Sequence, residues 1–274
     1  MKERILCSIS TRGRNFSTLP MAIQSVITQT RKPDKLVIFD DNDDPVDLRN
    51  VEIYKELLPI LELSGIEWSV LFGGKKGQHH NHQLANMMGY DWVWRLDDDT
   101  FAEPNVLETL CSYINDDIGA VAGSILTPSF MRDIQHKSGF SGKLTDVFTS
   151  YNLQWLEIKE LVEVEHLHCS FLYRAGVANY NLNLSRVAHG EETMFSNSLY
   201  RKGYKLLLVP NSKTWHLKVG SGGIRSTNKE KYYDFDENIF KKYVNNEKVT
   251  VVVLDNGRGD HICFKPVSYT HLRA

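Results

Sequence analysis

Three consecutive carboxylates, Asp97, Asp98 and Asp99, follow an aromatic, strand-like run in the segment WRLDDDTF. At an effective dielectric near 20, two such charges about 4 Å apart repel each other by roughly 4 kcal/mol, so the cluster needs something that offsets the repulsion. Alternate residues of a strand point the same way, which predicts that Asp97 and Asp99 share a face while Asp98 takes the other. Two hard oxygen ligands at this spacing suit Mg²⁺ or Mn²⁺, and such a cation could hold a diphosphate.

The triplet also has a plainer explanation, a solvated acidic turn in which one aspartate caps the following helix. A second acidic pair, Asp40 and Asp41, favours the metal interpretation because it ends another strand-like run, KLVIFD. In parallel sheets covered by helices, ligands bind beyond the carboxyl ends of the strands. Two acidic strand ends that face one crevice therefore predict a binding site.

The segments that must position these side chains alternate between strand-like and helix-like patterns through the first 126 residues. Ser17 is the expected cap of the first helix, Pro59 a kink in the second, and Gly65 the end of the second. This alternation predicts an α/β fold with a mostly parallel sheet covered on both faces. The expected strands lie at 4–10, 35–40, 66–72, 91–97 and 118–126, and the expected helices at 17–27, 47–64, 80–88 and 103–114.

The second half of the chain is less regular. Residues 127–170 form a long excursion, and loops of that length are usually functional or mobile. Order returns with strands in 162–174, a helix from Glu191 that Gly203 ends, two strands at 204–210 and 213–219, and a polar helix or connector at 228–243.

Composition and charge limit the classes of protein. The chain has 274 residues, of which 42% are hydrophobic and 24% charged, as in a globular protein with a full core. With a net charge of −2 and scattered basic residues, nucleic acid is not an expected partner. The four cysteines form no CxxC pair, and neither a signal peptide nor an apolar run of 18 residues is present. We expect a cytoplasmic domain without a transmembrane segment, which leaves peripheral membrane attachment through a partner open.

The order of these motifs resembles the GT-A fold of family-2 inverting glycosyltransferases over residues 4–220. The matching motifs are STRGR after the first strand, DD after the second, DDD after the fourth, and GEE at the start of a helix. The segment HGEETMFSNSLYRKGYKLLLVPNSKTWHL is similar to the family's acidic helix, its R..G(Y/F) run and its distal histidine. The resemblance implies a metal-dependent enzyme that moves a sugar from a nucleotide-sugar to a glycan, lipid-linked or other hydroxyl acceptor, in glycan or polysaccharide assembly.

Carried over residue by residue, the resemblance implies that Asp99 holds Mn²⁺ or Mg²⁺, with Asp97 as a direct or water-mediated ligand and His216 as a further contact. The general base would be Glu191 or Glu192, and Glu192 is favoured because the family's base usually occupies the second acidic position. Both glutamates could instead simply favour a helix N-terminus, and His216 could be a structural strand residue. The resemblance also implies the donor-binding residues. Thr11, Arg12 and Arg14 would surround the nucleotide, Asp40 and Asp41 would lie near its nucleobase, and Asp98 near its ribose.

Other residues of the chain could also take part in binding. His79, His80 and His82 resemble a metal cluster, but no carboxylate or cysteine accompanies them at ligand spacing. We therefore expect them in a loop or at a helix start near the donor. Trp155 and Tyr151, in the irregular region, could stack on a sugar ring.

Other classes of protein fit less well. The haloacid dehalogenase motif D-x-D-x-T/V is excluded because position 101 is Phe. A nucleotidyltransferase of similar fold would have a basic, Gly-rich loop after its first strand, for which STRGRN is a partial candidate. A non-catalytic nucleotide- or sugar-binding module stays open as well.

The resemblance divides the chain into a GT-A domain at 1–224, a connector at 225–247 and a fragment at 248–274. The fragment contains NGRGDHI, which resembles the opening strand and turn of a GT-B-type transferase. Too few residues follow it to complete an α/β domain, so we expect an incomplete unit there.

Overall fold

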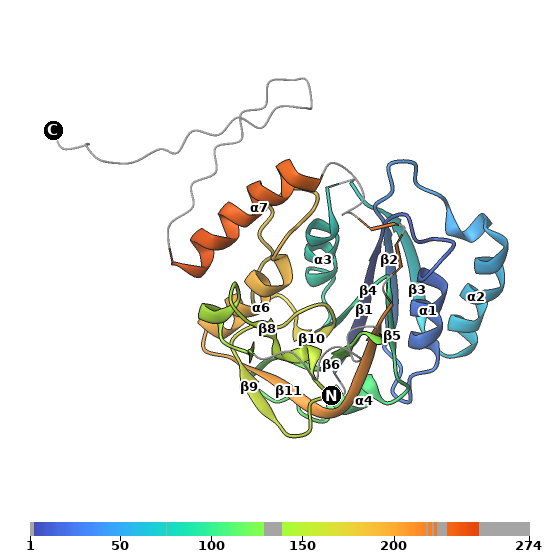
Figure 1. Ribbon diagram of the computed structural model, residues 1–274. Coiled ribbons are helices and arrows are strands. Elements are labelled where there is room, and N and C mark those ends of the chain that lie inside the picture. The colour runs from blue at the N-terminus through green and yellow to red at the C-terminus, as the bar shows by residue number, and fades with distance from the viewer. Residues whose placement is uncertain are drawn as a thin grey trace.

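The computed structural model describes residues 3–74, 76–128, 139–217, 219–220, 222–223 and 229–246, without the side chains of 229–231. The expected fragment at 248–274 lies outside the described residues. Within them, a nine-stranded sheet is flanked by helices on both faces (Figure 1). The predicted α/β class is confirmed.

The sheet contains six long strands that run in one direction and three short strands that run in the other. The order along the main path is β3-β2-β1-β4-β10-β6-β11-β5, and β9 pairs with β11. The mostly parallel sheet is thus confirmed, but β10 lies antiparallel between β4 and β6. The long strands are β1 (Ile5–Thr11), β2 (Lys35–Asp40), β3 (Glu67–Phe72), β4 (Trp92–Asp97), β6 (Ile118–Leu126) and β11 (Lys205–His216), and the short ones are β5 (Thr100–Ala102), β9 (Val162–Val164) and β10 (Phe171–Arg174).

Each face of the sheet contributes to its own hydrophobic core, because alternate strand residues point to opposite sides. In β1, Ile5, Cys7 and Ile9 pack under α1 (Leu19–Ile27), α2 (Glu52–Leu63) and α4 (Val106–Cys111). Leu6 points to the other side, against the core beneath α3 (Gln78–Asn86) and α6 (Glu191–Arg201). Figure 1 shows α1 and α2 on one side of β1–β4 and α3 on the other. The smaller elements are β7 (Phe140–Ser141), β8 (Tyr151–Asn152) and the 3₁₀ turns Leu48–Asn50, Leu144–Asp146 and Leu153–Trp155.

The structure corrects several predicted boundaries. The first helix is not capped by Ser17, because Thr18 occupies the N-cap position and makes no capping hydrogen bond with its side chain. The helix expected at 103–114 covers only α4, and that at 47–64 is a 3₁₀ turn followed by α2, which continues through Pro59.

The two strands expected at 204–210 and 213–219 form one strand, β11. Pro210 and Asn211 look like a turn in the sequence, and Asn211 does have a positive φ of 59°. The chain nevertheless pairs with β6 on both sides of a register shift between Leu208 and Lys213, so the turn-like residues form an irregularity within the strand.

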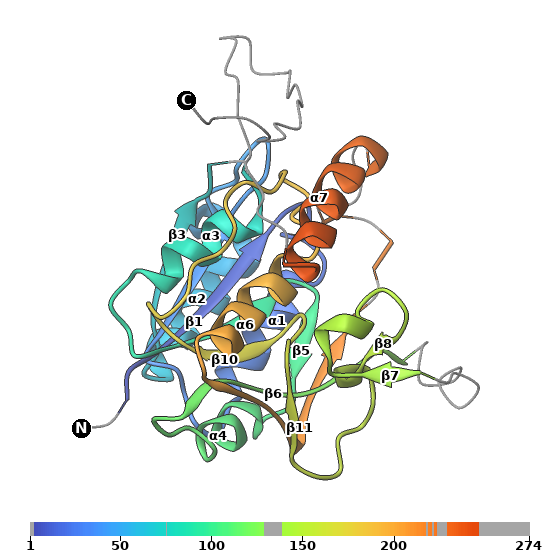
Figure 2. The same ribbon diagram turned by 90° about the vertical axis from the view of Figure 1, so that its left-hand side faces the viewer.

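A last helix, α7 (Lys229–Val244), packs against α6 (Figure 2). Its Ile239 and Phe240 share a small core with Leu184 and Met194. A Cβ atom at Gly190, directly before α6, would lie 2.8 Å from the Phe240 ring, and Gly190 also has a φ of 75°. Both the contact and the backbone therefore require glycine there. The segment expected as a polar helix or connector is a helix that packs on the domain.

Asp236 of α7 fixes the loop that leads into α6. Its buried carboxylate accepts hydrogen bonds from the backbone N–H of Ser185 at 2.6 Å, the Ser185 hydroxyl at 2.8 Å and the backbone N–H of His189 at 2.9 Å. Ala188 in this loop has a φ of 54°, which is unfavourable for a residue with a side chain. The carboxylate thus holds a backbone conformation that the loop's own residues do not favour.

We expect Asp236→Ala to lower the free energy of unfolding by about 2–4 kcal/mol, because hydrogen bonds to a charged group contribute roughly 1.5–3 kcal/mol and their buried donors would be left unpaired. Asp234→Ala is the matched control, since Asp234 is exposed on the same helix. Urea unfolding followed by circular dichroism measures both variants. Equal effects would mean that contacts other than Asp236 hold the loop.

Candidate active site

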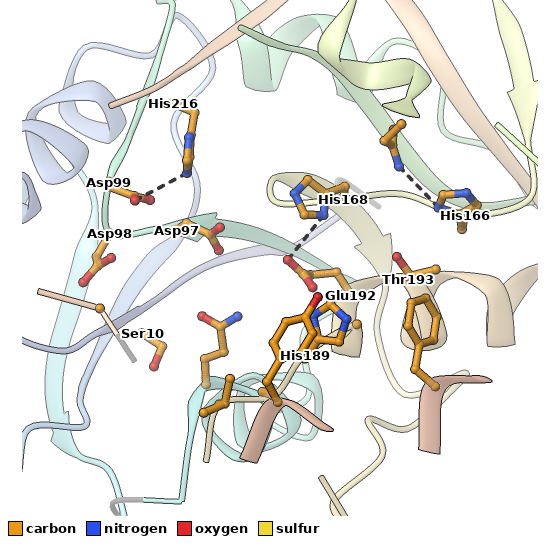
Figure 3. Close-up of a pocket in the computed structure, with 18 of the residues that line it drawn as sticks. Ser10, Asp97, Asp98, Asp99, His166, His168, His189, Glu192, Thr193 and His216 are labelled. Atoms are coloured by element: carbon orange, nitrogen blue, oxygen red, sulfur yellow. Dashed lines mark hydrogen bonds and ion pairs between the residues drawn. The ribbon is translucent and has the colours of Figure 1, made fainter. Parts of the chain in front are cut away.

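A pocket of about 540 Å³ is lined by the ends of β1 and β4, the start of α6 and part of α7. Figure 3 shows Glu192 in its middle, with the acidic triplet and His216 on one side and His189 and Thr193 on the other. Parallel strands end at one edge of the sheet, so β1 and β4, which are neighbours, bring Thr11 and the triplet together. The predicted site residues are therefore mostly lining residues of a single cavity.

Asp98 is the most heavily bonded member of the triplet. Its carboxylate accepts hydrogen bonds from the Thr11 hydroxyl at 2.8 Å, the Arg12 backbone N–H at 3.2 Å and the Arg14 guanidinium at 2.7 Å. Burial raises the pKa of Asp98 to about 6, against the opposing effect of Arg14. The loop after β1 is thus tied to the end of β4 through one carboxylate.

Asp97 and Asp99 both line the pocket, although only Asp97 belongs to the strand. The strand ends at Asp97, which contacts Arg95 at 3.2 Å, and the chain then turns into β5. Asp99 contacts Arg14 at 2.9 Å and the His216 imidazole at 3.4 Å. The helix-cap alternative is wrong for α4, whose N-cap residue is Asn105.

The chemistry of this cluster fits a divalent cation. No three His, Cys, Asp or Glu side chains converge at metal-ligand spacing among the described residues. However, the Arg14 guanidinium lies on Asp99 as a stand-in cation, and His216 reaches the same carboxylate oxygen. Burial opposes the ionisation of Asp97. The nearby Arg95 and His216 nevertheless lower the pKa of Asp97, so this carboxylate is also charged. Carboxylate and imidazole groups of this kind suit Mg²⁺ or Mn²⁺.

The two candidate bases have different environments. Glu191 is fully buried, and its carboxylate oxygens lie 2.9 and 3.1 Å from the Arg95 guanidinium. The Gln78 amide donates a further hydrogen bond to Glu191 at 3.0 Å. Burial raises the pKa of Glu191 to about 8 while Arg95 opposes that rise, so Glu191 is a buried structural partner of Arg95 and its oxygens are occupied.

Glu192 faces the pocket. Its nearest ionisable contact is His168, whose Nδ1 lies 3.6 Å from the Glu192 carboxylate (Figure 3). The Trp155 ring lies next to the rings of both His168 and His216, with centroids 5.6 and 5.8 Å away. Glu192 is thus the glutamate that lines the pocket, beside the rings of Trp155, His168 and His216.

Two predicted donor residues are not brought into this pocket. The Asp40 carboxylate accepts hydrogen bonds from the backbone N–H groups of Asn42 and Val46, at 2.9 and 3.0 Å, so it holds its own loop. Asp41 is buried and accepts from the Gly77 backbone N–H at 3.1 Å. Arg12 does line the pocket, and its guanidinium donates to the Asp41 carbonyl at 2.9 Å and pairs with Asp43.

The three histidines lie within α3. His79 and His82 are buried, and His82 shares a 3.1 Å hydrogen bond with Ser8 of β1. Burial lowers the pKa of His79 to about 3 and lowers that of His82 as well, so both rings are neutral. His82 ties α3 to the sheet through Ser8 of β1.

Several residues at the site were not predicted from the sequence. Arg95 had a usable signal, since it is a charged residue inside an otherwise apolar strand, where it must be paired. Gln78 and the α7 residues Tyr233 and Phe240, which also line the pocket, gave no comparable signal.

The family model described as Glycosyl transferase family 2 matches residues 8–179, more than half of the chain. The chain belongs to this family. Among proteins of known sequence, it is similar to galactofuranosyltransferase GlfT1 of Mycolicibacterium smegmatis, with 30% identity over 109 residues. That match covers 39% of this chain and 34% of GlfT1, so it spans about a third of the relative's length.

Solved structures of glycosyltransferases share the fold of this family 2 chain. A crystal structure of GalNAc-T7 with UDP, GalNAc and Mn²⁺ has a TM-score of 0.59 and 16% identity, covering 79% of this chain and 44% of that one. Residues 1–349 of S. aureus TarS with UDP-GlcNAc give a TM-score of 0.61 and 13% identity, covering 90% of this chain and 68% of that one. The predicted GT-A fold is confirmed. Among the residues that the structure describes, no helix has both the length and the apolar character needed to cross a bilayer.

We expect Glu191→Gln to destabilise this family 2 domain by about 3–5 kcal/mol, because it leaves the buried Arg95 charge without its main counter-ion. Glu192→Gln is the matched control, one residue away, and should change the free energy of unfolding by less than about 1 kcal/mol. Chemical denaturation measures both. A larger loss in the Glu192 variant would reverse the two assignments.

A pH effect should arise from His79. Its folded pKa, about 3, lies below the unfolded value near 6.5, so the unfolded chain takes up a proton first as the pH falls. Between pH 7.5 and 5.5 the wild type should lose about 1.4 kcal/mol more unfolding free energy than His79→Gln. Denaturation at both pH values measures this difference. The same pH dependence in both proteins would mean that His79 has the same pKa in the fold as in the unfolded chain.

Proposed function

We propose that this pocket transfers a sugar from a nucleotide-sugar donor to a hydroxyl acceptor, with inversion at the anomeric carbon. One observation carries the proposal. Glu192 shares a cavity with the acidic triplet, while the neighbouring Glu191 is occupied by Arg95. The cavity therefore offers a base and a cation-binding cluster on the two sides where an acceptor and a diphosphate would lie.

The donor binds at the end that contains Thr11, Arg12 and Arg14. Arg14 is the group suited to the diphosphate, because a guanidinium pairs with two phosphate oxygens at once. A uridine nucleotide is the first donor to test, since solved structures of the same fold hold UDP or UDP-GlcNAc. Asp40 and Asp41 would reach the nucleobase of the donor only if the loops around them rearrange.

In the transfer step, Glu192 accepts the proton of an acceptor hydroxyl whose oxygen attacks the anomeric carbon from the face opposite the diphosphate. The bond between the anomeric carbon and the diphosphate oxygen breaks, and a nucleoside diphosphate leaves. When bound by Asp99, Asp97 and His216, Mn²⁺ or Mg²⁺ would neutralise charge on the leaving group. Arg95 keeps Asp97 and Glu191 in position, and His168 orients Glu192.

The acceptor reaches Glu192 from the side formed by His168, His189 and Thr193 (Figure 3). These polar side chains, together with the Trp155 ring, suit a hydroxyl-bearing group such as a sugar, free in a glycan or linked to a lipid. We place the reaction in glycan or polysaccharide assembly.

We expect Glu192→Gln to bind the nucleotide-sugar with unchanged affinity and to lose at least about a hundredfold of the transfer rate, the usual range for a general base. Asp99→Ala should instead lose metal-dependent donor binding. Calorimetry with UDP and Mn²⁺, and release of nucleoside diphosphate from a panel of nucleotide-sugars, separate the two effects. Turnover at the wild-type rate by Glu192→Gln would contradict the assignment of Glu192 as the general base. Binding without turnover by the wild type would favour a non-catalytic module.

A further inference from the structure

We propose that Arg14 is an internal cation that competes with the divalent metal ion for the acidic triplet until the donor diphosphate draws it away. The inference rests on the proposed function, because it concerns the order in which charges assemble in the same pocket. It assigns Arg14 a second task besides donor binding, namely control of metal affinity.

The first observation is the geometry of the guanidinium. One terminal nitrogen of Arg14 lies 2.7 Å from Oδ1 of Asp98, and the other lies 2.9 Å from Oδ2 of Asp99. The Asp99 oxygen is also the atom that His216 Nε2 approaches, at 3.4 Å. The guanidinium and a metal ion held by Asp99 and His216 would therefore share one carboxylate oxygen.

The second observation is the packing around Arg14, whose side chain is only 14% exposed. A Cβ atom on Gly222 would lie 2.7 Å from Arg14 Cγ, and one on Gly223 would lie 3.0 Å from a guanidinium nitrogen. The Gly223 N–H also donates to the Arg12 carbonyl at 2.7 Å. Gly222 and Gly223 thus pack on Arg14 on the side away from the triplet's oxygens, so the contact is part of the folded packing.

Charge explains why the two cations exclude each other. Asp98 and Asp99 supply two negative charges, and a divalent ion at the same oxygen would place its charge a few ångström from the guanidinium. A bound diphosphate changes this balance, because it offers Arg14 two other oxygens for a bidentate contact. Metal and nucleotide should therefore bind cooperatively, and by linkage each should raise the affinity of the other by the same factor.

The test measures Mn²⁺ affinity directly, by electron paramagnetic resonance of free Mn²⁺, with and without UDP. We expect Arg14→Gln to bind Mn²⁺ about tenfold more tightly than the wild type in the absence of UDP, a difference of about 1.4 kcal/mol. UDP should raise Mn²⁺ affinity less in this variant than in the wild type. Arg14→Lys, which keeps the charge, should stay closer to the wild type.

Arg12→Ala is the matched control. It removes the same charge from the same loop, but the Arg12 guanidinium contacts the Asp41 carbonyl and Asp43, not the triplet. Its Mn²⁺ affinity without UDP should equal that of the wild type. Circular dichroism establishes whether each variant is folded. If Arg14→Gln does not fold, Arg14→Met is measured in its place as a second neutral variant.

Two results would overturn the inference in distinguishable ways. Equal or weaker Mn²⁺ binding by the neutral Arg14 variants, with normal UDP-dependent binding by the wild type, would remove the competition and leave the proposed function intact. No Mn²⁺ binding by any of the proteins, with or without UDP, would remove both the competition and the proposed metal site.

Discussion

The site depends on one buried positive charge. Arg95 is fully buried in β4, where removing a guanidinium from water is costly unless its partners are close. Glu191 and Asp97 supply those partners from the start of α6 and the end of β4. The requirement to neutralise Arg95 therefore fixes the distance between the acidic triplet and the helix that carries Glu192. Glu192 and the acidic triplet are thus held at a fixed spacing by a buried charge that lies beneath the pocket rather than in its lining.

This arrangement explains why two adjacent glutamates are not equivalent. In a helix, neighbouring residues point about 100° apart, so when Glu191 turns inward to Arg95, Glu192 is directed to the pocket. The sequence favours the second glutamate only through a family resemblance. The structure gives a physical reason, because the first is already bound on both oxygens.

Much of the fold was predictable because local patterns and tertiary structure agree there. The strands β2 and β6 match their expected bounds, and α6 starts at Glu191 as its acidic N-terminus indicates. The errors arose where long-range pairing overrides local signals. Pro210 and Asn211 resemble a turn, yet pairing with β6 carries the strand through them.

The site was predicted less completely than the fold, for a related reason. The acidic triplet and the two glutamates are local motifs, so the sequence could identify them. The direction of each carboxylate depends on partners far along the chain, such as Arg14 for Asp99, and the strand itself ends at Asp97. Asp40 and Asp41 show the same limit, since their hydrogen bonds to nearby backbone turn them away from the cavity.

The close contact between Gly190 and the Phe240 ring couples two segments that are far apart in sequence. Helix α7 contacts the loop before α6 through Asp236 and Phe240, and the Phe240 ring also meets that of Phe148. A displacement of α7 would therefore move the loop that leads into α6, and with it the first turn of the helix that contains Glu192.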